Sequence, residues 1–197
     1  MRFLILPWLA VSLSAQTALY EIKPGPDSRF ALEIYKTGFM SGKKHLLLFE
    51  RFAGALNYNA AAPEVSRLDL NVESASFTVK DDWVSASQAK SIREEAAGKN
   101  GLEVTKYPQI RFVASSIAKS GDGFTVQGTL TIRGVDKPVT VAVSMKPEPA
   151  GGALRFEGKA EVKLKDYGIK PPTAALGAVG TKNEMAVSFS LIATPRR

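Results

Sequence analysis

The chain has 197 residues, of which 45% are hydrophobic and 23% are charged. This length suits one domain with a full hydrophobic core, and the composition excludes a disordered or fibrous protein. The sequence has 26 Lys and Arg against 19 Asp and Glu, a net charge of +7, and no cysteine, which excludes disulfides, thiol catalysis and cysteine zinc sites.

Basic residues are scattered along the chain. They stand singly or in pairs such as Lys43-Lys44, and residues 155–163 alternate between basic and acidic side chains. Alternation of this kind is typical of a solvated strand face, whereas a nucleic-acid groove needs clustered cations. We expect no nucleic-acid partner. Transient contact with an anionic membrane surface is compatible with the charge.

The first 15 residues form a distinct segment. Met1-Arg2 precedes an apolar stretch over 3–13, and the small residues Ser14 and Ala15 follow it. A stretch of this length is too short to cross a bilayer, which takes about 20 residues. We therefore expect a signal peptide over 1–15, a single domain over 16–197, and a periplasmic or secreted location.

From residue 20 onward, apolar and polar residues alternate with a period of two. This pattern indicates strands with one buried and one solvated face, so the chain is expected to be all-β. The short connection at 134–138 between two such runs predicts a hairpin. In chain order, the apolar faces fall within 30–34, 68–72, 124–132, 139–143, 156–164 and 185–191.

One segment departs from the β pattern. Ser85-Ala-Ser-Gln88 has the form of a helix capping box, good helix formers follow it, and Gly98 or Gly101 can end the helix. We expect one helix of about three turns near 85–99, placed across one end of the sheet.

About eight two-faced strands can satisfy all their edges by closing into an antiparallel up-and-down β-barrel, with a sandwich as the alternative. The predicted inward faces carry Gly128, Gly158 and Ala160 beside larger apolar residues. These small residues either permit strand bending or make room for a ligand.

Four stretches resemble one known family. Residues 128–139, Gly-Thr-Leu-Thr-Ile-Arg-Gly-Val-Asp-Lys-Pro-Val, resemble the signature hairpin of the YceI-like, lipid- or polyisoprenoid-binding family. Residues 20–30, Lys106-Tyr107-Pro108-Gln-Ile-Arg-Phe112 and Asp166-Tyr-Gly168-Ile169 agree in order and spacing. The family's usual Asp-x-x-His-Ser opening is replaced here by Lys23-Pro-Gly-Pro-Asp27-Ser28, and residues 36–52 are unusually rich in Lys, Leu and Phe.

The resemblance implies a lipocalin-like eight-stranded barrel whose apolar interior carries an isoprenoid or a similar long amphiphilic lipid. Such an occupant is held by burial of apolar area, at about 25 cal/mol per Å², without catalytic chemistry. For each candidate, plain core packing is the alternative to ligand contact. The expected lining residues are Phe30, Leu32, Ile34, Phe39, Leu46, Leu48, Phe112, Leu130, Ile132 and Tyr167.

A polar head group would be served by hydrogen-bond donors near the mouth of the pocket. Lys43, Lys44, His45 and Arg51 lie in one stretch between expected strands, so they are candidates for this contact. The alternative is a solvated basic loop.

The residues for enzymatic chemistry are missing. His45 is the single histidine, and no nucleophile-elbow motif accompanies it. Asp81 and Asp82 are adjacent, so on a strand they would point to opposite faces. We expect no metal, no cofactor and no catalytic residue, and therefore not an enzyme.

Residues 170–182 form the longest irregular loop of the C-terminal half, which either gates a pocket or is a mobile connection. Three interpretations remain open: a lipid carrier, a filled barrel that serves the envelope without a small ligand, and an enzyme acting on a bound isoprenoid or quinone. The sequence also leaves a homodimer open.

Overall fold

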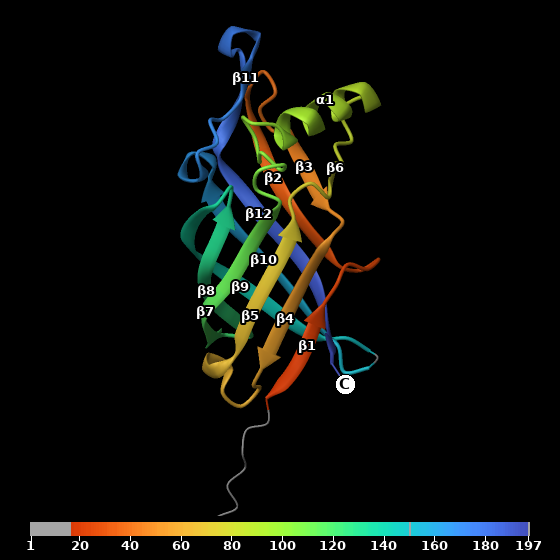
Figure 1. Ribbon diagram of the computed structural model, residues 1–197, viewed down its shortest axis with the longest axis vertical. Helices are drawn as coiled ribbons and strands as arrows, with labels where there is room; N and C mark the ends of the chain where they lie inside the picture. Colours follow the sequence, from red (N-terminus) through yellow and green to blue (C-terminus); the bar gives the residue numbers. More distant parts are fainter. Residues whose placement is uncertain (1–16, 150, 197) are drawn as a thin grey trace, which may run out of the picture.

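The structure, a computed structural model, describes residues 17–149 and 151–196; the expected signal peptide lies outside these residues. The described chain forms one antiparallel β-sheet with a single α-helix (Figure 1). The strands are β1 (Ala18–Ile22), β2 (Arg29–Gly38), β3 (Lys44–Phe49), β4 (Phe52–Tyr58), β5 (Arg67–Glu73), β6 (Phe77–Val79), β7 (Gln109–Ser120), β8 (Gly123–Ile132), β9 (Val135–Pro147), β10 (Leu154–Lys163), β11 (Thr173–Ala174) and β12 (Val179–Pro195).

The sheet closes on itself. Its strand order runs β1-β4-β5-β7-β8-β9-β10-β12, and β12 pairs again with β1 through Ile22 and Ala193. The long strand β12 also pairs with β2, so β1 and β2 lie end to end along it. In the same way β3 continues into β4 beyond a break at 50–51. Likewise β5 continues into β6 beyond a break at 74–76. The expected eight-stranded antiparallel barrel is thus confirmed, with three of its eight strands each interrupted once.

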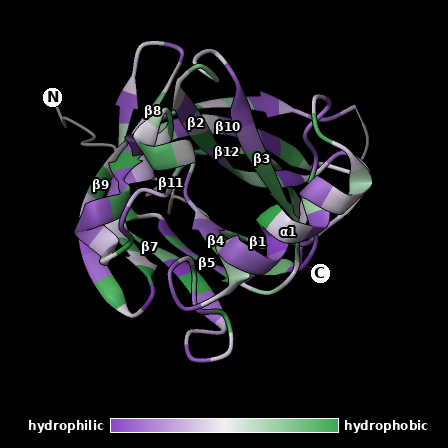
Figure 2. Cartoon of the chain, turned by 90° about the horizontal axis from the view of Figure 1, so that it is seen from above, coloured by the Kyte–Doolittle hydropathy of each residue, from purple (hydrophilic) through white to green (hydrophobic). Residues whose placement is uncertain are grey.

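The helix α1 (Ala86–Ala97) lies at one end of this barrel. The capping box is present, since the Ser85 hydroxyl accepts from the Gln88 amide and the Gln88 side chain accepts from the Ser85 amide. Arg93 ties the helix to the chain around β6 by donating to the carbonyls of Phe77 (3.2 Å) and Ala75 (3.0 Å). In the view down the barrel, α1 covers one side of this end (Figure 2).

The core follows the alternation of the strands. Phe30, Leu32, Val187 and Leu191 are at most 6% exposed and point inward. Three short 3₁₀ helices, η1 (Pro63–Val65), η2 (Leu164–Tyr167) and η3 (Ala175–Gly177), complete the connections. The barrel interior is therefore the place to look for a site.

Candidate functional site

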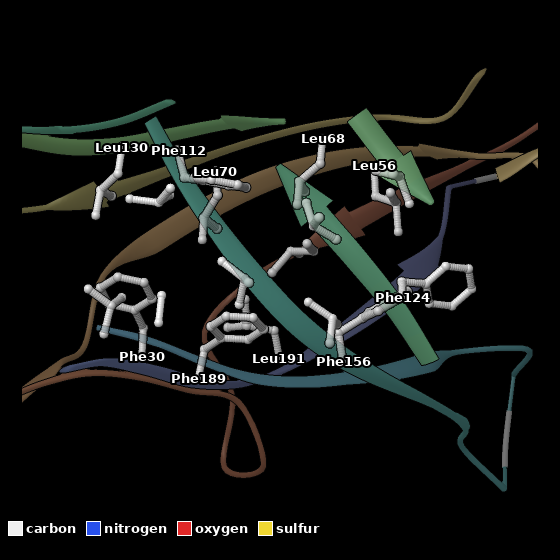
Figure 3. Close-up of a pocket in the computed structure, with 18 of the residues that line it drawn as sticks. Phe30, Leu56, Leu68, Leu70, Phe112, Phe124, Leu130, Phe156, Phe189 and Leu191 are labelled. Carbon is white, nitrogen blue, oxygen red and sulfur yellow. The ribbon is translucent and has the colours of Figure 1, made fainter. Parts of the chain in front are cut away.

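A cavity lies inside the barrel (Figure 3). It holds about 900 Å³ of atom-free space including its open part, of which about 90 Å³ admits the centre of a water molecule. Nine strands contribute to its lining. The lining residues are Ile22, Phe30, Leu56, Tyr58, Leu68, Leu70, Phe112, Ile117, Phe124, Val126, Leu130, Val139, Val141, Val143, Phe156, Ala160, Val187, Phe189 and Leu191.

The lining is chemically uniform. Tyr58 is the one lining residue with a polar side-chain atom, and burial, helped by the nearby Tyr20, raises the pKa of its hydroxyl. A neutral tyrosine adds no charge to the interior at neutral pH. The surface of the large cavity therefore suits hydrocarbon and offers nothing to compensate an ion.

At two glycines of the barrel strands, Gly128 and Gly158, a phenyl ring of a neighbouring strand forms the wall of the cavity. A Cβ atom built on Gly128 would lie 2.5 Å from Cζ of Phe112, and one on Gly158 would lie 2.6 Å from Cζ of Phe189. Each ring occupies the space that a side chain would fill, and both Phe112 and Phe189 line the cavity (Figure 3). The glycines thus make room, but the room is taken by rings of the neighbouring strands.

A second cavity lies at the α1 end of the barrel, with about 700 Å³ of atom-free space including its open part and about 90 Å³ open to water centres. Its deep residues, such as Leu32, Leu47 and Met185, are apolar, whereas Lys36, His45, Glu95, Asn100 and Thr181 supply polar groups. The two cavities follow each other along the barrel, because Leu32 of the second is the cross-strand partner of Val187 of the first.

His45 is held in a fixed orientation at this second cavity. Its Nδ1 lies 2.6 Å from Oδ2 of Asp81, whose side chain is fully buried and also accepts from the Leu46 amide at 2.8 Å. The imidazole stacks on Trp83 at 5.2 Å between ring centroids. Since a carboxylate accepts hydrogen bonds, the proton sits on Nδ1 in the neutral ring, and Nε2 has no hydrogen-bond partner among the described residues.

Five of the ten lining residues expected from the sequence do line a cavity. Phe30, Phe112 and Leu130 line the large cavity, and Leu32 and Ile34 line the second one. Ile132 and Tyr167 are 0% and 1% exposed and belong to the packed core, outside the lining of both cavities.

Three of the expected lining residues lie outside the lining of both cavities. Phe39 lies in the turn after β2 and is 89% exposed. Leu46 and Leu48 pair with Glu33 and Ala31 on the outer face of the sheet, while Leu47 and Phe49 point inward. The run Leu46-Leu-Leu48 is apolar throughout, so its pattern alone does not fix which residues face in.

The expected head-group residues are not gathered into one cluster. Lys44 forms an ion pair with Glu33 (2.9 Å), and Lys43 lies over the Trp83 ring at 5.9 Å. Arg51 lies at the break between β3 and β4, where it pairs with Glu73. Of the four, His45 alone lines one of the two cavities described above.

Several lining residues were not singled out from the sequence. Leu56, Phe124, Val141, Phe156 and Phe189 all face the large cavity. Most of them lie on the alternating faces at 124–132, 139–143, 156–164 and 185–191, so the signal was present. What it lacked was the position of each residue along the barrel axis.

Within the described part of the chain, we find no helix long and apolar enough to cross a membrane. In residues 17–149 and 151–196, no three His, Asp or Glu side chains stand together as metal ligands.

Closure of the sheet around an apolar interior defines a lipocalin-like β-barrel. The sequence comparison agrees, because the model of the YceI-like domain matches residues 20–193. The chain belongs to the YceI-like family.

Two relatives have moderate sequence identity to this chain. The UPF0312 protein of Yersinia pestis (strain Pestoides F) is 32% identical over 144 residues, covering 71% of this chain and 69% of that protein. The UPF0312 protein of Azotobacter vinelandii is 35% identical over 127 residues, 62% of each chain. These relatives do not carry the name of an enzyme.

Solved structures show the same fold. The crystal structure of Burkholderia cenocepacia BcnA matches with a TM-score of 0.66 at 24% identity, covering 84% of this chain and 96% of BcnA. The Campylobacter jejuni YCEI protein matches with a TM-score of 0.55 at 15% identity, covering 76% and 83%.

Proposed function

We propose that this protein is a carrier that holds a long apolar lipid, of isoprenoid or similar amphiphilic kind, inside the barrel. The observation that carries the proposal is the large cavity, whose lining residues are all apolar except for Tyr58. About 90 Å³ of this cavity is open to the centre of a water molecule, so side chains alone do not fill the barrel interior.

Binding needs no chemistry beyond burial. Each Å² of apolar surface taken out of water contributes about 25 cal/mol, so the branched methyl groups of an isoprenoid add affinity in a rigid apolar wall. The wall is preorganised by Phe112 and Phe189, which are held over glycines. A rigid site of this kind reduces the entropy cost of binding.

The second cavity suits the polar end of such a ligand. Because Leu32 and Val187 are direct neighbours across β2 and β12, the two cavities follow each other, and a chain longer than the large cavity would extend toward the second one. There, His45 presents Nε2 as acceptor when neutral and as donor when protonated. We assign head-group contact to His45 and leave Lys44 and Arg51 to their carboxylate partners.

A carrier role would fit an exported protein. The basic, apolar and small residues of positions 1–15 are the basis for proposing a periplasmic or secreted location. An apolar lipid crosses an aqueous compartment only when its chain is shielded from water.

Titration calorimetry with prenyl alcohols of increasing length tests the proposal. The substitution Ala160→Leu fills part of the large cavity, whereas Ala142→Leu makes the same change on the exposed face of the adjacent strand β9. We expect Ala160→Leu to weaken binding about tenfold or more, which corresponds to a loss of about 1.4 kcal/mol in binding free energy. Ala142→Leu should bind like the wild type. Equal binding by all three proteins would contradict the proposed site.

A further inference from the structure

Two connections project together from the α1 end of the barrel. They are residues 36–43, around the turn between β2 and β3, and residues 170–182, which include β11 and η3; we call them the tip (Figure 1). Each presents one bulky apolar side chain to solvent, since Phe39 is 89% exposed and Leu176 is fully exposed.

The tip is built by hydrogen bonds. The Phe39 amide donates to the Ala178 carbonyl at 3.2 Å, and β11 pairs with the start of β12 through Thr173 and Gly180. A Cβ atom on Gly38 would lie 2.0 Å from the Ala178 oxygen, so only glycine permits this approach. The backbone of Leu176 is left-handed, with φ of 54°, an uncommon conformation for leucine. These contacts fix the two turns that carry Phe39 and Leu176 side by side.

The charge of the tip has one sign. Its two segments contain Lys36, Lys43, Lys170 and Lys182 and no Asp or Glu. Among the described residues, none of these four lysines forms an ion pair, whereas Lys44 and Lys159 on the barrel wall both pair with Glu33. The two segments that carry the exposed Phe39 and Leu176 therefore also carry four lysines without an ion-pair partner among the described residues, although Lys43 also lies over the Trp83 ring.

We infer that the tip docks the protein onto an anionic lipid bilayer. Phe39 and Leu176 would enter the interface between head groups and acyl chains, and the four lysines would contact phosphate groups. The second cavity opens at this same end, and its lining includes Lys36, Pro172 and Thr181 from the two segments. Docking would therefore place that cavity next to the bilayer. The inference stands on the surface alone and goes beyond the carrier proposal.

Vesicle sedimentation tests this inference. The protein without its expected signal peptide is mixed with vesicles of phosphatidylcholine alone or of equal parts phosphatidylcholine and phosphatidylglycerol. We expect binding to the anionic vesicles, little binding to phosphatidylcholine, and a decrease with added salt. The double variant Phe39→Ser, Leu176→Ser should bind the anionic vesicles at least about tenfold more weakly than the wild type. The double variant Lys43→Glu, Lys182→Glu should show a similar loss.

A matched control lies at the opposite end of the barrel. Leu19 and Val65 are 41% and 50% exposed, and the double variant Leu19→Ser, Val65→Ser should bind vesicles like the wild type. All variants change exposed side chains, and circular dichroism checks that the fold is kept. Equal vesicle binding by tip and control variants would overturn the inference. So would a concentration-dependent dimer that ultracentrifugation detects and the tip variant abolishes, since a second copy would then cover the tip. Lipid titration in the absence of vesicles reports on the carrier proposal separately.

Discussion

Gly158 on β10 lies directly opposite Phe189 on β12, and the phenyl ring occupies the space of the missing side chain, with Cζ 2.6 Å from the position of a Cβ atom. The glycine is what lets the ring lie against the sheet. The carbonyl of Ala142 closes the same space at 2.9 Å, so the backbone leaves no alternative room.

We predict that Gly158→Ala pushes Phe189 into the large cavity. Overpacking of this kind costs about 1–3 kcal/mol of unfolding free energy. The same displacement should weaken prenyl alcohol binding, because the ring takes up ligand space. Urea unfolding and calorimetry measure the two effects. Gly25→Ala is the control, since a Cβ there meets nothing within 4 Å. A Gly158→Ala protein of unchanged stability and affinity would show that the ring does not shape the cavity.

Glu33 predicts a pH dependence of stability. Burial alone would raise its pKa, but hydrogen bonds from Lys44, Lys159, Tyr35 and Ser188 lower it from 4.5 to about 2. A lowered folded-state pKa stabilises the fold above pH 4.5, and this contribution is lost as the pH falls toward 2. Because both lysines are about half exposed, we expect a contribution of about 1–3 kcal/mol.

Urea unfolding of Glu33→Gln at several pH values measures this contribution. The variant should be less stable than the wild type at pH 6, and the difference should shrink as the pH approaches 2. Glu64→Gln on the exposed helix η1 is the control and should leave the profile unchanged. A constant gap between Glu33→Gln and the wild type across this range would contradict the assignment.

Because the hydroxyl of Tyr167 is buried, we predict that its removal does not destabilise the fold. Its hydroxyl is buried without a hydrogen-bond partner among the described residues, and burial, with the nearby Asp166 carboxylate, raises its pKa to about 12. Removing an unsatisfied polar atom from a core is neutral or stabilising. Tyr167→Phe should therefore keep or raise the unfolding free energy, by up to about 1 kcal/mol.

The matched variant is Tyr35→Phe, in which the lost hydroxyl donates to Glu33 and accepts from Lys159, both at 2.9 Å. We expect this variant to lose about 1 kcal/mol in the same unfolding measurement. If Tyr167→Phe were the more destabilised of the two, the hydroxyl of Tyr167 would have to have a partner after all.

The His45–Asp81 pair predicts a tautomer. In the wild type the carboxylate accepts from Nδ1, so the neutral ring carries its proton there. In Asp81→Asn, the oxygen can keep the Leu46 amide bond while the new NH₂ group faces Nδ1, which then becomes an acceptor. Nitrogen NMR of His45 should show the proton on Nδ1 in the wild type and on Nε2 in the variant. The same tautomer in both proteins would argue against control by Asp81.

The barrel could be predicted from the sequence because strands with one buried face repeat a simple alternation of apolar and polar residues. The helix was also predictable, since Ser85 and Gln88 are local signals of its start. The lining was predicted only in part. The orientation of Leu46 and Leu48 follows from pairing with β2, and Phe39 is exposed because its turn continues beyond the barrel wall. The packing of Phe189 on Gly158 depends on register between distant strands, which no local pattern contains.

The central claim is that the large cavity holds an apolar lipid, and native mass spectrometry of protein purified without detergent tests it most directly. We predict a bound species with the mass of an isoprenoid-like lipid, retained in Ala142→Leu and lost or replaced by a shorter molecule in Ala160→Leu. A wild-type protein that is empty after expression in a lipid-containing host, and stays empty after incubation with prenyl lipids, would contradict the claim and favour a barrel without a small ligand.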